Sequence, residues 1–194
     1  RGYGIFAKYA FFRLDNGDII PVAHPDFQKM DQLFEYKRER DLILKNTEAL
    51  VSGAGASNML LYGDAGTGKS TSVKALINEY YDRGLRMIEI YKHQFGLLSK
   101  VIAQVKNRNY RFMIFIDDLS FASNDGDFAA LKAILEGSVN GSCGNLVVYA
   151  TSNRRNIVRQ RFSERQDDVN ERDTLEEKFS LADRFDLRLT FTAP

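Results

Sequence analysis

Short apolar runs alternate with longer stretches of mixed polarity through most of the chain after residue 58. The apolar runs have the length of buried strands, and the stretches between them repeat apolar residues at helical spacing. Strands that alternate with helices in this way form a mainly parallel sheet covered on both faces. The pattern therefore predicts a three-layer, doubly wound α/β fold around a five-stranded sheet. The predicted strands are residues 58–62, 86–90, 112–116, 146–150 and 187–191, and the predicted helices are residues 69–81, 96–106 and 127–136.

The chain before residue 58 has a different pattern. Residues 4–22 consist of short apolar stretches on either side of an Asn-Gly pair, which is a strong reverse-turn signal and predicts a β-hairpin. Residues 31–52 mix leucines with charged residues at roughly helical spacing and precede two glycines, which predicts a helix that ends there. We therefore expect an N-terminal extension at residues 1–30 and one main domain at residues 31–194.

The composition fits a globular domain rather than a disordered or fibrous chain. Its 194 residues, 44% of them hydrophobic, are enough for a sizeable core. Twenty-seven basic residues against 26 acidic ones leave a net charge of +1, so a nucleic-acid or membrane contact would need a local patch. The single Cys143 cannot form an internal disulfide, and no apolar run is long enough for a signal peptide or a membrane span. We expect a cytoplasmic protein without a membrane partner.

The segment after residue 62 matches the phosphate-loop pattern G-x-x-x-x-G-K-[ST]. It lies between a predicted strand and a predicted helix, which is the context that the pattern requires; a tight turn without a ligand is the alternative. Backbone N–H groups and the helix N-terminus would face a phosphate, Lys69 would bridge the outer phosphates, and Ser70 would ligate Mg²⁺. The sequence thus predicts an Mg·ATP site. The residues predicted to bind the nucleotide are Gly63, Asp64, Ala65, Gly66, Thr67, Gly68, Lys69, Ser70 and Thr71.

Polar side chains follow two later strands. Asp117 and Asp118 end the apolar run 112–116 in a Walker B pattern, and Asn153 closely follows the strand at 146–150. Asp117 would hold Mg²⁺ through water, while Asp118 would orient or activate the attacking water. Asn153 can donate to a phosphate oxygen and accept from a water at once. The alternative is that these residues only form turns, which Asp and Asn favour at strand ends.

These segments, together with Leu-Ala-Asp-Arg-Phe at residues 181–185, resemble the AAA+ ATPases and occur in the order that this superfamily uses. The resemblance runs from about Asp31 to the end of the chain. It implies that Asn153 is the sensor-1 residue and that Arg184 is an arginine finger inserted into a neighbouring subunit's site, hence self-association through the ATP site. Four short motifs are similar to those of a bacterial AAA+ family known only as a domain of unknown function. They are Asn-Thr-Glu-Ala-Leu, Asp-Asp-Leu-Ser-Phe, Ala-Thr-Ser-Asn-Arg-Arg and Asp-Arg-Phe.

Some features limit what the resemblance implies. Most AAA+ enzymes have Glu where this chain has Asp118, and a shorter carboxylate predicts slow hydrolysis. The chain begins at Arg1 and ends at Pro194 directly after a predicted strand. We expect both ends to be cuts through a longer protein, and the helical lid of the superfamily to be absent. Arg184 could instead pair with a nearby acid such as Asp183 or Asp186.

Two further features have alternative explanations, and the two histidines show no metal-binding pattern. The apolar candidates for an adenine contact, by resemblance to the AAA+ N-linker, could equally belong to the core; they are Leu33, Phe34 and Tyr36. The basic residues from Arg154 to Arg165 could contact a nucleic acid, or could lie in a solvated loop whose charges the following acids offset. His24 and His93 lack partners at metal-ligand spacing, so we expect no zinc site there.

We consider three functions. The first is an AAA+ ATPase that couples Mg·ATP hydrolysis to the remodelling or loading of an unidentified partner. The second is a nucleotide-dependent switch or scaffold that binds ATP and scarcely hydrolyses it. The third is a small-molecule kinase, which the extra strand between the two Walker segments and the presence of Asn153 disfavour.

Overall fold

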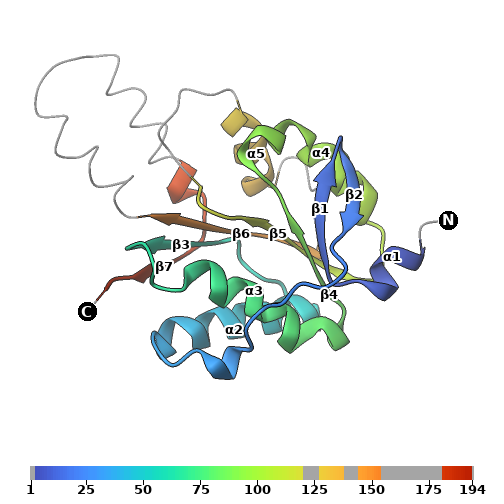
Figure 1. Cartoon of the computed structure of the whole chain (residues 1–194). Helices are drawn as coiled ribbons and strands as arrows, with labels where there is room; N and C mark the ends of the chain where they lie inside the picture. Colours follow the sequence, from blue (N-terminus) through green and yellow to red (C-terminus); the bar gives the residue numbers. More distant parts are fainter. Residues whose placement is uncertain (1–2, 120–126, 138–143, 154–180, 194) are drawn as a thin grey trace, which may run out of the picture.

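Seven strands form one sheet within the residues that the computed structural model describes, which are 3–119, 127–137, 144–153 and 181–193 (Figure 1). Across the sheet the strands follow the order β2-β1-β4-β5-β6-β3-β7, and the neighbouring pairs are parallel except β1 with β2. β6 therefore lies between β3 and β5. The strands are β1 (Phe11–Asp15), β2 (Asp18–Pro21), β3 (Met59–Gly63), β4 (Leu85–Glu89), β5 (Arg111–Ile116), β6 (Leu146–Asn153) and β7 (Leu187–Phe191).

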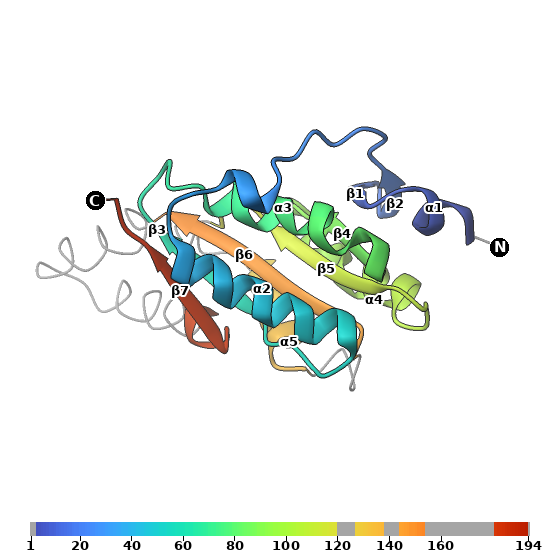
Figure 2. The ribbon, with the colours of Figure 1, turned by 90° about the horizontal axis from the view of Figure 1, so that it is seen from below.

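Helices cover both faces of this sheet. α2 and α3 lie on one face, and α4 and α5 lie on the other (Figures 1 and 2). The predicted three-layer α/β class is confirmed. None of the helices in the described ranges is long and apolar enough to cross a membrane. The helices are α1 (Tyr3–Lys8), α2 (Lys37–Ser52), α3 (Lys69–Tyr80), α4 (Leu98–Val105) and α5 (Asp127–Leu135), with 3-10 turns η1 (Met30–Gln32), η2 (Tyr81–Arg83) and η3 (Lys92–Leu97).

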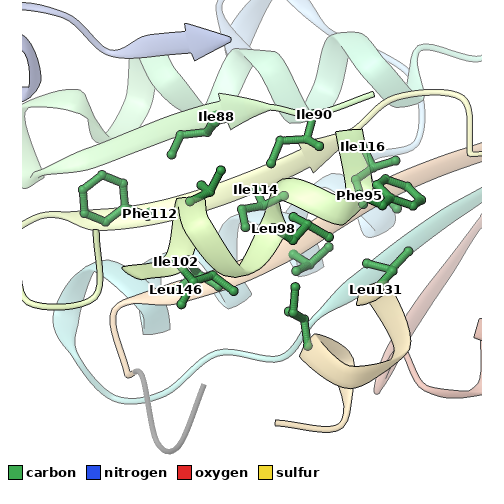
Figure 3. Close-up of a cluster of buried hydrophobic side chains, with 14 of the residues drawn as sticks. Ile88, Ile90, Phe95, Leu98, Ile102, Phe112, Ile114, Ile116, Leu131 and Leu146 are labelled. Carbon is green, nitrogen blue, oxygen red and sulfur yellow. The ribbon is translucent and has the colours of Figure 1, made fainter. Parts of the chain in front are cut away.

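The central strands are apolar on both faces because each face is covered by helices. Successive residues of a strand point to opposite faces. In β5, Phe112, Ile114 and Ile116 belong to the core beneath α4 and α5, as Figure 3 shows. Met113 and Phe115 belong to the second core, beneath α2 and α3. This double burial explains why β5 is a continuous apolar run that delivers its next residues to the edge of the sheet.

The described sheet has seven strands rather than the five predicted, because the N-terminal hairpin joins it. β1 pairs in parallel with β4, with Phe12 opposite Ile88. The hairpin was predicted, but its first residues form helix α1 instead. Phe6 of α1 is buried, and its ring lies 4.9 Å from that of Phe12 and 5.2 Å from that of Phe112. The division into residues 1–30 and 31–194 stays a prediction.

Helix α2 begins at Lys37, later than the predicted start at residue 31. Tyr36 precedes it in a left-handed conformation with φ of 57°. The ring of Tyr36 lies 4.9 Å from that of Phe191, and its hydroxyl donates to the carbonyl of Thr192 at 2.7 Å. Packing of Tyr36 against the end of β7 therefore outweighs the local helical pattern in this segment.

Candidate functional site

The phosphate loop begins at Gly63, which lies opposite Phe191 of β7. Gly63 has φ of 144°, and a Cβ atom there would overlap the carbonyl oxygen of Phe191. The same oxygen accepts from the backbone N–H of Asp64 at 2.9 Å. Only glycine fits this approach of two backbones. The first glycine of the pattern therefore serves the strand pairing.

The other two glycines shape the loop itself. Gly66 and Gly68 have φ of 75° and 81°, the left-handed region that favours glycine. A Cβ atom at either position would meet no other atom within 4 Å, so both positions border open space. Gly68 is also the residue from which α3 begins. The start of α3 and the turns of the loop thus face the same opening.

Lys69 turns back into the loop. Its side chain is buried, and Nζ donates to the carbonyl of Asp64 at 2.6 Å, to that of Gly63 at 3.3 Å and to Oγ1 of Thr67 at 3.3 Å. Burial lowers the pKa of Lys69, and the carboxylates of Asp64, Asp118 and Asp117 oppose that shift. A buried ammonium needs such acceptors. Phosphate oxygens could take their place.

Asp117 connects the loop to the two strand ends. Its Oδ2 accepts from Oγ of Ser70 at 3.1 Å, and its Oδ1 accepts from Oγ1 of Thr151 at 2.8 Å. One carboxylate therefore spans from the first turn of α3 to the end of β6. A hydroxyl and a carboxylate that face one opening are donors of the kind that Mg²⁺ takes alongside nucleotide phosphates, so these residues fit the predicted metal.

Asp118 lies next to Asp117 but faces outward. Its backbone is left-handed, with φ of 54°. Its N–H donates to Oγ1 of Thr151 at 2.9 Å, and its Oδ1 accepts from Nδ2 of Asn153 at 3.2 Å. The structure therefore brings Asp118, which was predicted to orient or activate the water, into direct contact with Asn153, which was predicted to accept from a water and donate to a phosphate oxygen.

These groups line an open pocket of about 250 Å³. Most of the site residues predicted from the sequence line it, whereas Gly63, Asp64 and Ala65 do not. Thr151 is an addition that the sequence analysis did not assign. The lining residues are Gly66, Thr67, Gly68, Lys69, Ser70, Thr71, Asp117, Asp118, Thr151 and Asn153.

Arg184 is not among the residues that line this pocket. Its Nε donates to Oε1 of Glu136, directly after α5. Asp183, one of the two acids suggested as its partner, instead accepts from Arg188 at 2.7 Å. An arginine that acts on a neighbouring subunit would lie outside its own pocket, so its predicted role stays a prediction.

The candidates for an adenine contact, Leu33, Phe34 and Tyr36, are not among the residues that line the pocket. Tyr36 is held against β7 as described above, while Phe34 is 87% exposed. The predicted basic segment from Arg154 to Arg165 and Cys143 lie outside the described residues. Within the described residues, no group of three or more His, Cys, Asp or Glu side chains could hold a metal ion.

Solved structures share this fold at low sequence identity. A DnaI structure is 13% identical with a TM-score of 0.58, and the match covers 97% of each chain. ORC2 of Aeropyrum pernix, solved as ADPNP-ADP complexes, is 14% identical with a TM-score of 0.53 over 86% of this chain and 52% of that chain. The RuvB Holliday junction branch migration motor of Thermotoga maritima is 17% identical with a TM-score of 0.52 over 84% of this chain and 47% of that chain.

The present chain thus spans about half the length of the ORC2 and RuvB chains. The three solved structures share the fold that the resemblance to the AAA+ ATPases predicts, so the resemblance is confirmed for the fold. No curated protein matches the sequence. A family profile matches residues 6–194. The chain therefore belongs to the family described as Protein of unknown function (DUF815).

Proposed function

We propose that this domain binds Mg·ATP in the pocket beside the phosphate loop and hydrolyses it, and that this cycle drives the remodelling or loading of a partner macromolecule. One observation carries the proposal. The hydroxyl of Ser70 and the carboxylate of Asp117, which come from separate parts of the chain, meet at 3.1 Å in a pocket that also contains Lys69. A tight turn without a ligand would not require that meeting.

The phosphate loop would bind the triphosphate. Lys69 would exchange its bonds to the carbonyls of Gly63 and Asp64 for phosphate oxygens, while the backbone N–H groups at the start of α3 supply further donors. Ser70 and Asp117 would hold Mg²⁺, Ser70 directly and Asp117 through water. When bound, the metal would neutralise charge on the transferring phosphoryl group.

Asp118 and Asn153 would orient the attacking water. Asp118 is exposed at the pocket, and its bond from Asn153 fixes the carboxylate relative to the end of β6. Asn153 could also donate to the outer phosphate. Because an aspartate is one methylene shorter than a glutamate, we expect slow hydrolysis by a single copy.

Arg184 would complete the site of a second copy of the chain. Arginine fingers supplied in trans accelerate phosphoryl transfer by about 10³ to 10⁵. A single copy should therefore be nearly inactive, and assembled copies should be active. The ion pair with Glu136 would orient Arg184 on the surface that meets the neighbour.

The test is phosphate release from Mg·ATP, per mole of protein, across a wide series of protein concentrations. Lys69→Ala is the blank, and Lys45→Ala, which removes an exposed lysine of α2, is its matched control. We expect activity to rise with concentration and Arg184→Ala to abolish the rise, whereas Arg188→Ala should retain it. If a fluorescent ATP analogue binds the wild type no better than the Lys69→Ala protein, the proposed nucleotide site is wrong.

A second candidate function is an ATP-binding switch or scaffold with little hydrolysis. It is favoured by Asp118, whose short side chain bonds to Asn153 and whose backbone is left-handed. ATP binding with a hydrolysis rate that stays at the blank level would support it.

A further inference from the structure

We infer that Thr151 is the positioning residue of this site, whose single hydroxyl orients both Asp117 and Asp118. This inference rests on the proposed function and names the residue that would prepare the metal ligand and the water-orienting carboxylate. Thr151 lies in β6 directly after Ala150, which pairs with Ile116 at the end of β5, and it is only 3% exposed. The sequence motifs assign it no role.

The direction of both hydrogen bonds follows from elementary chemistry. The backbone N–H of Asp118 can only donate, so Oγ1 of Thr151 accepts that bond, which is 2.9 Å long. The hydroxyl has one proton, and it goes to Oδ1 of Asp117 at 2.8 Å. Thr151 thus accepts from one acidic residue and donates to the other, and a side chain without a hydroxyl would break both bonds together.

The donated bond determines which oxygen of Asp117 would face the water through which Asp117 would hold Mg²⁺. With Oδ1 engaged by Thr151, Oδ2 is the oxygen on the side of Ser70. A charge-assisted bond of this kind restrains the rotation of the carboxylate about its last torsion. Loss of a residue that orients a metal-binding group in this way typically lowers metal affinity or activity by about 10- to 100-fold.

The accepted bond stabilises an unfavourable backbone conformation. Asp118 has φ of 54°, a backbone angle that residues other than glycine adopt only rarely. Two further bonds hold the same turn to β6: the N–H of Leu119 donates to the carbonyl of Thr151 at 2.7 Å, and Oγ of Ser152 donates to the carbonyl of Leu119 at 2.8 Å. The left-handed turn directs Asp118 outward, where it meets Asn153.

Ser152 provides a matched control because it is a neighbouring buried hydroxyl on the same strand. Its partner is a backbone carbonyl, not a carboxylate of the site. A variant that lacks the Ser152 hydroxyl loses a buried bond of the same turn but leaves Asp117 oriented. Any effect that Thr151 and Ser152 share is therefore structural, and an effect specific to Thr151 reports on the site.

The experiment compares Thr151→Val, Thr151→Ser and Ser152→Ala. Valine keeps the shape of threonine without the hydroxyl, and serine keeps the hydroxyl. The primary readout is the affinity of the protein for Mn²⁺ in the presence of a non-hydrolysable ATP analogue, with metal-free nucleotide binding measured in parallel. We expect Thr151→Val to weaken Mn²⁺ binding about 10- to 100-fold, with metal-free nucleotide affinity unchanged. Thr151→Ser and Ser152→Ala should stay near the wild type.

Amide hydrogen exchange of Asp118 in the protein without nucleotide or metal is the second readout. Exchange there should accelerate in Thr151→Val and not in Thr151→Ser, and Thr151→Ala serves in its place if the valine variant does not fold. Unchanged Mn²⁺ affinity in a folded Thr151→Val protein, or an equal loss in Ser152→Ala, would overturn the inference. If the wild type binds no Mn²⁺–nucleotide, the proposed function fails while the exchange measurement still decides whether Thr151 holds Asp118.

Discussion

The two halves of the site are built in different ways. The phosphate loop is a contiguous segment, residues 63–70, which is shaped by its glycines and by bonds within the loop and is tied at Gly63 and Asp64 to the end of β7. The strand-end half joins Asp117 and Asp118 to Thr151 and Asn153, 34 and 35 residues further along the chain. Those residues meet only because β5 and β6 are paired, with Ile116 opposite Ala150.

We expect this difference to separate binding from reaction. In the proposed function the loop half, apart from Ser70, would present N–H groups and an ammonium to phosphates, so changes there should act on nucleotide affinity. The strand-end half would present carboxylates and an amide to metal and water, so changes there should act on the hydrolysis rate while nucleotide still binds. Substitutions in each half test whether the separation holds.

The largest effect is expected from Asp117→Asn. Removing the charge that faces Ser70 should cost several kcal/mol of transition-state stabilisation, a fall of about 100-fold or more in phosphate release. Metal-free nucleotide affinity should change little, and Asp82→Asn, an exposed aspartate elsewhere, is the control. Equal losses in metal-free binding and in hydrolysis would mean that the two halves do not act separately.

The next largest effect concerns stability and lies within the loop half. Gly63→Ala adds a Cβ atom against the carbonyl of Phe191 and also strains a positive φ, so we expect it to lower the free energy of unfolding by about 2 to 6 kcal/mol. In Gly66→Ala the added Cβ atom meets no other atom within 4 Å. Only the left-handed φ of this position is then unfavourable, and we expect it to lower the free energy of unfolding by about 1 to 2 kcal/mol.

Denaturant unfolding of the two glycine variants gives the comparison directly. Gly66→Ala should remain folded but bind nucleotide more weakly, because its new methyl group borders the pocket. Similar unfolding free energies for the two proteins would show that β7 does not need the close approach at Gly63.

A smaller effect, of opposite sign, is expected from Asp118→Glu in the strand-end half. The longer side chain brings the carboxylate nearer to the water, so hydrolysis should rise roughly 10-fold, a part of the 10² to 10⁴ that a positioned base supplies. Asp118→Asn should lower the rate, and nucleotide affinity should be the same in both proteins. A glutamate variant no faster than wild type would mean that side-chain length does not limit the reaction.

The same division explains how much could be predicted from the sequence. The strands, the helices that follow them and the phosphate loop were identified because their signals are local. The pairing of β1 with β4 and the role of Thr151 could not be identified, since both depend on which strands become neighbours in space. Helix α1 was missed because Phe6 is held by rings from distant strands. For Arg184 one alternative was a pair with a nearby acid such as Asp183 or Asp186, whereas its partner in the structure is Glu136, which lies 48 residues away.

The smallest expected effect concerns Asp64, a loop residue whose side chain bonds to the segment after β7. Oδ2 of Asp64 accepts from the backbone N–H of Ala193 at 2.8 Å, at the end of β7. Asp64→Ala should lower the free energy of unfolding by only about 0.5 to 1.5 kcal/mol, the usual contribution of one hydrogen bond. Exchange of the Ala193 amide should accelerate, whereas Asp64→Asn keeps an acceptor and should protect it. Nucleotide affinity should stay near the wild-type value in both variants, because the carbonyl of Asp64 that Lys69 contacts is retained. A marked loss of affinity in Asp64→Ala would instead place this side chain in the binding half and tie the end of β7 to the nucleotide.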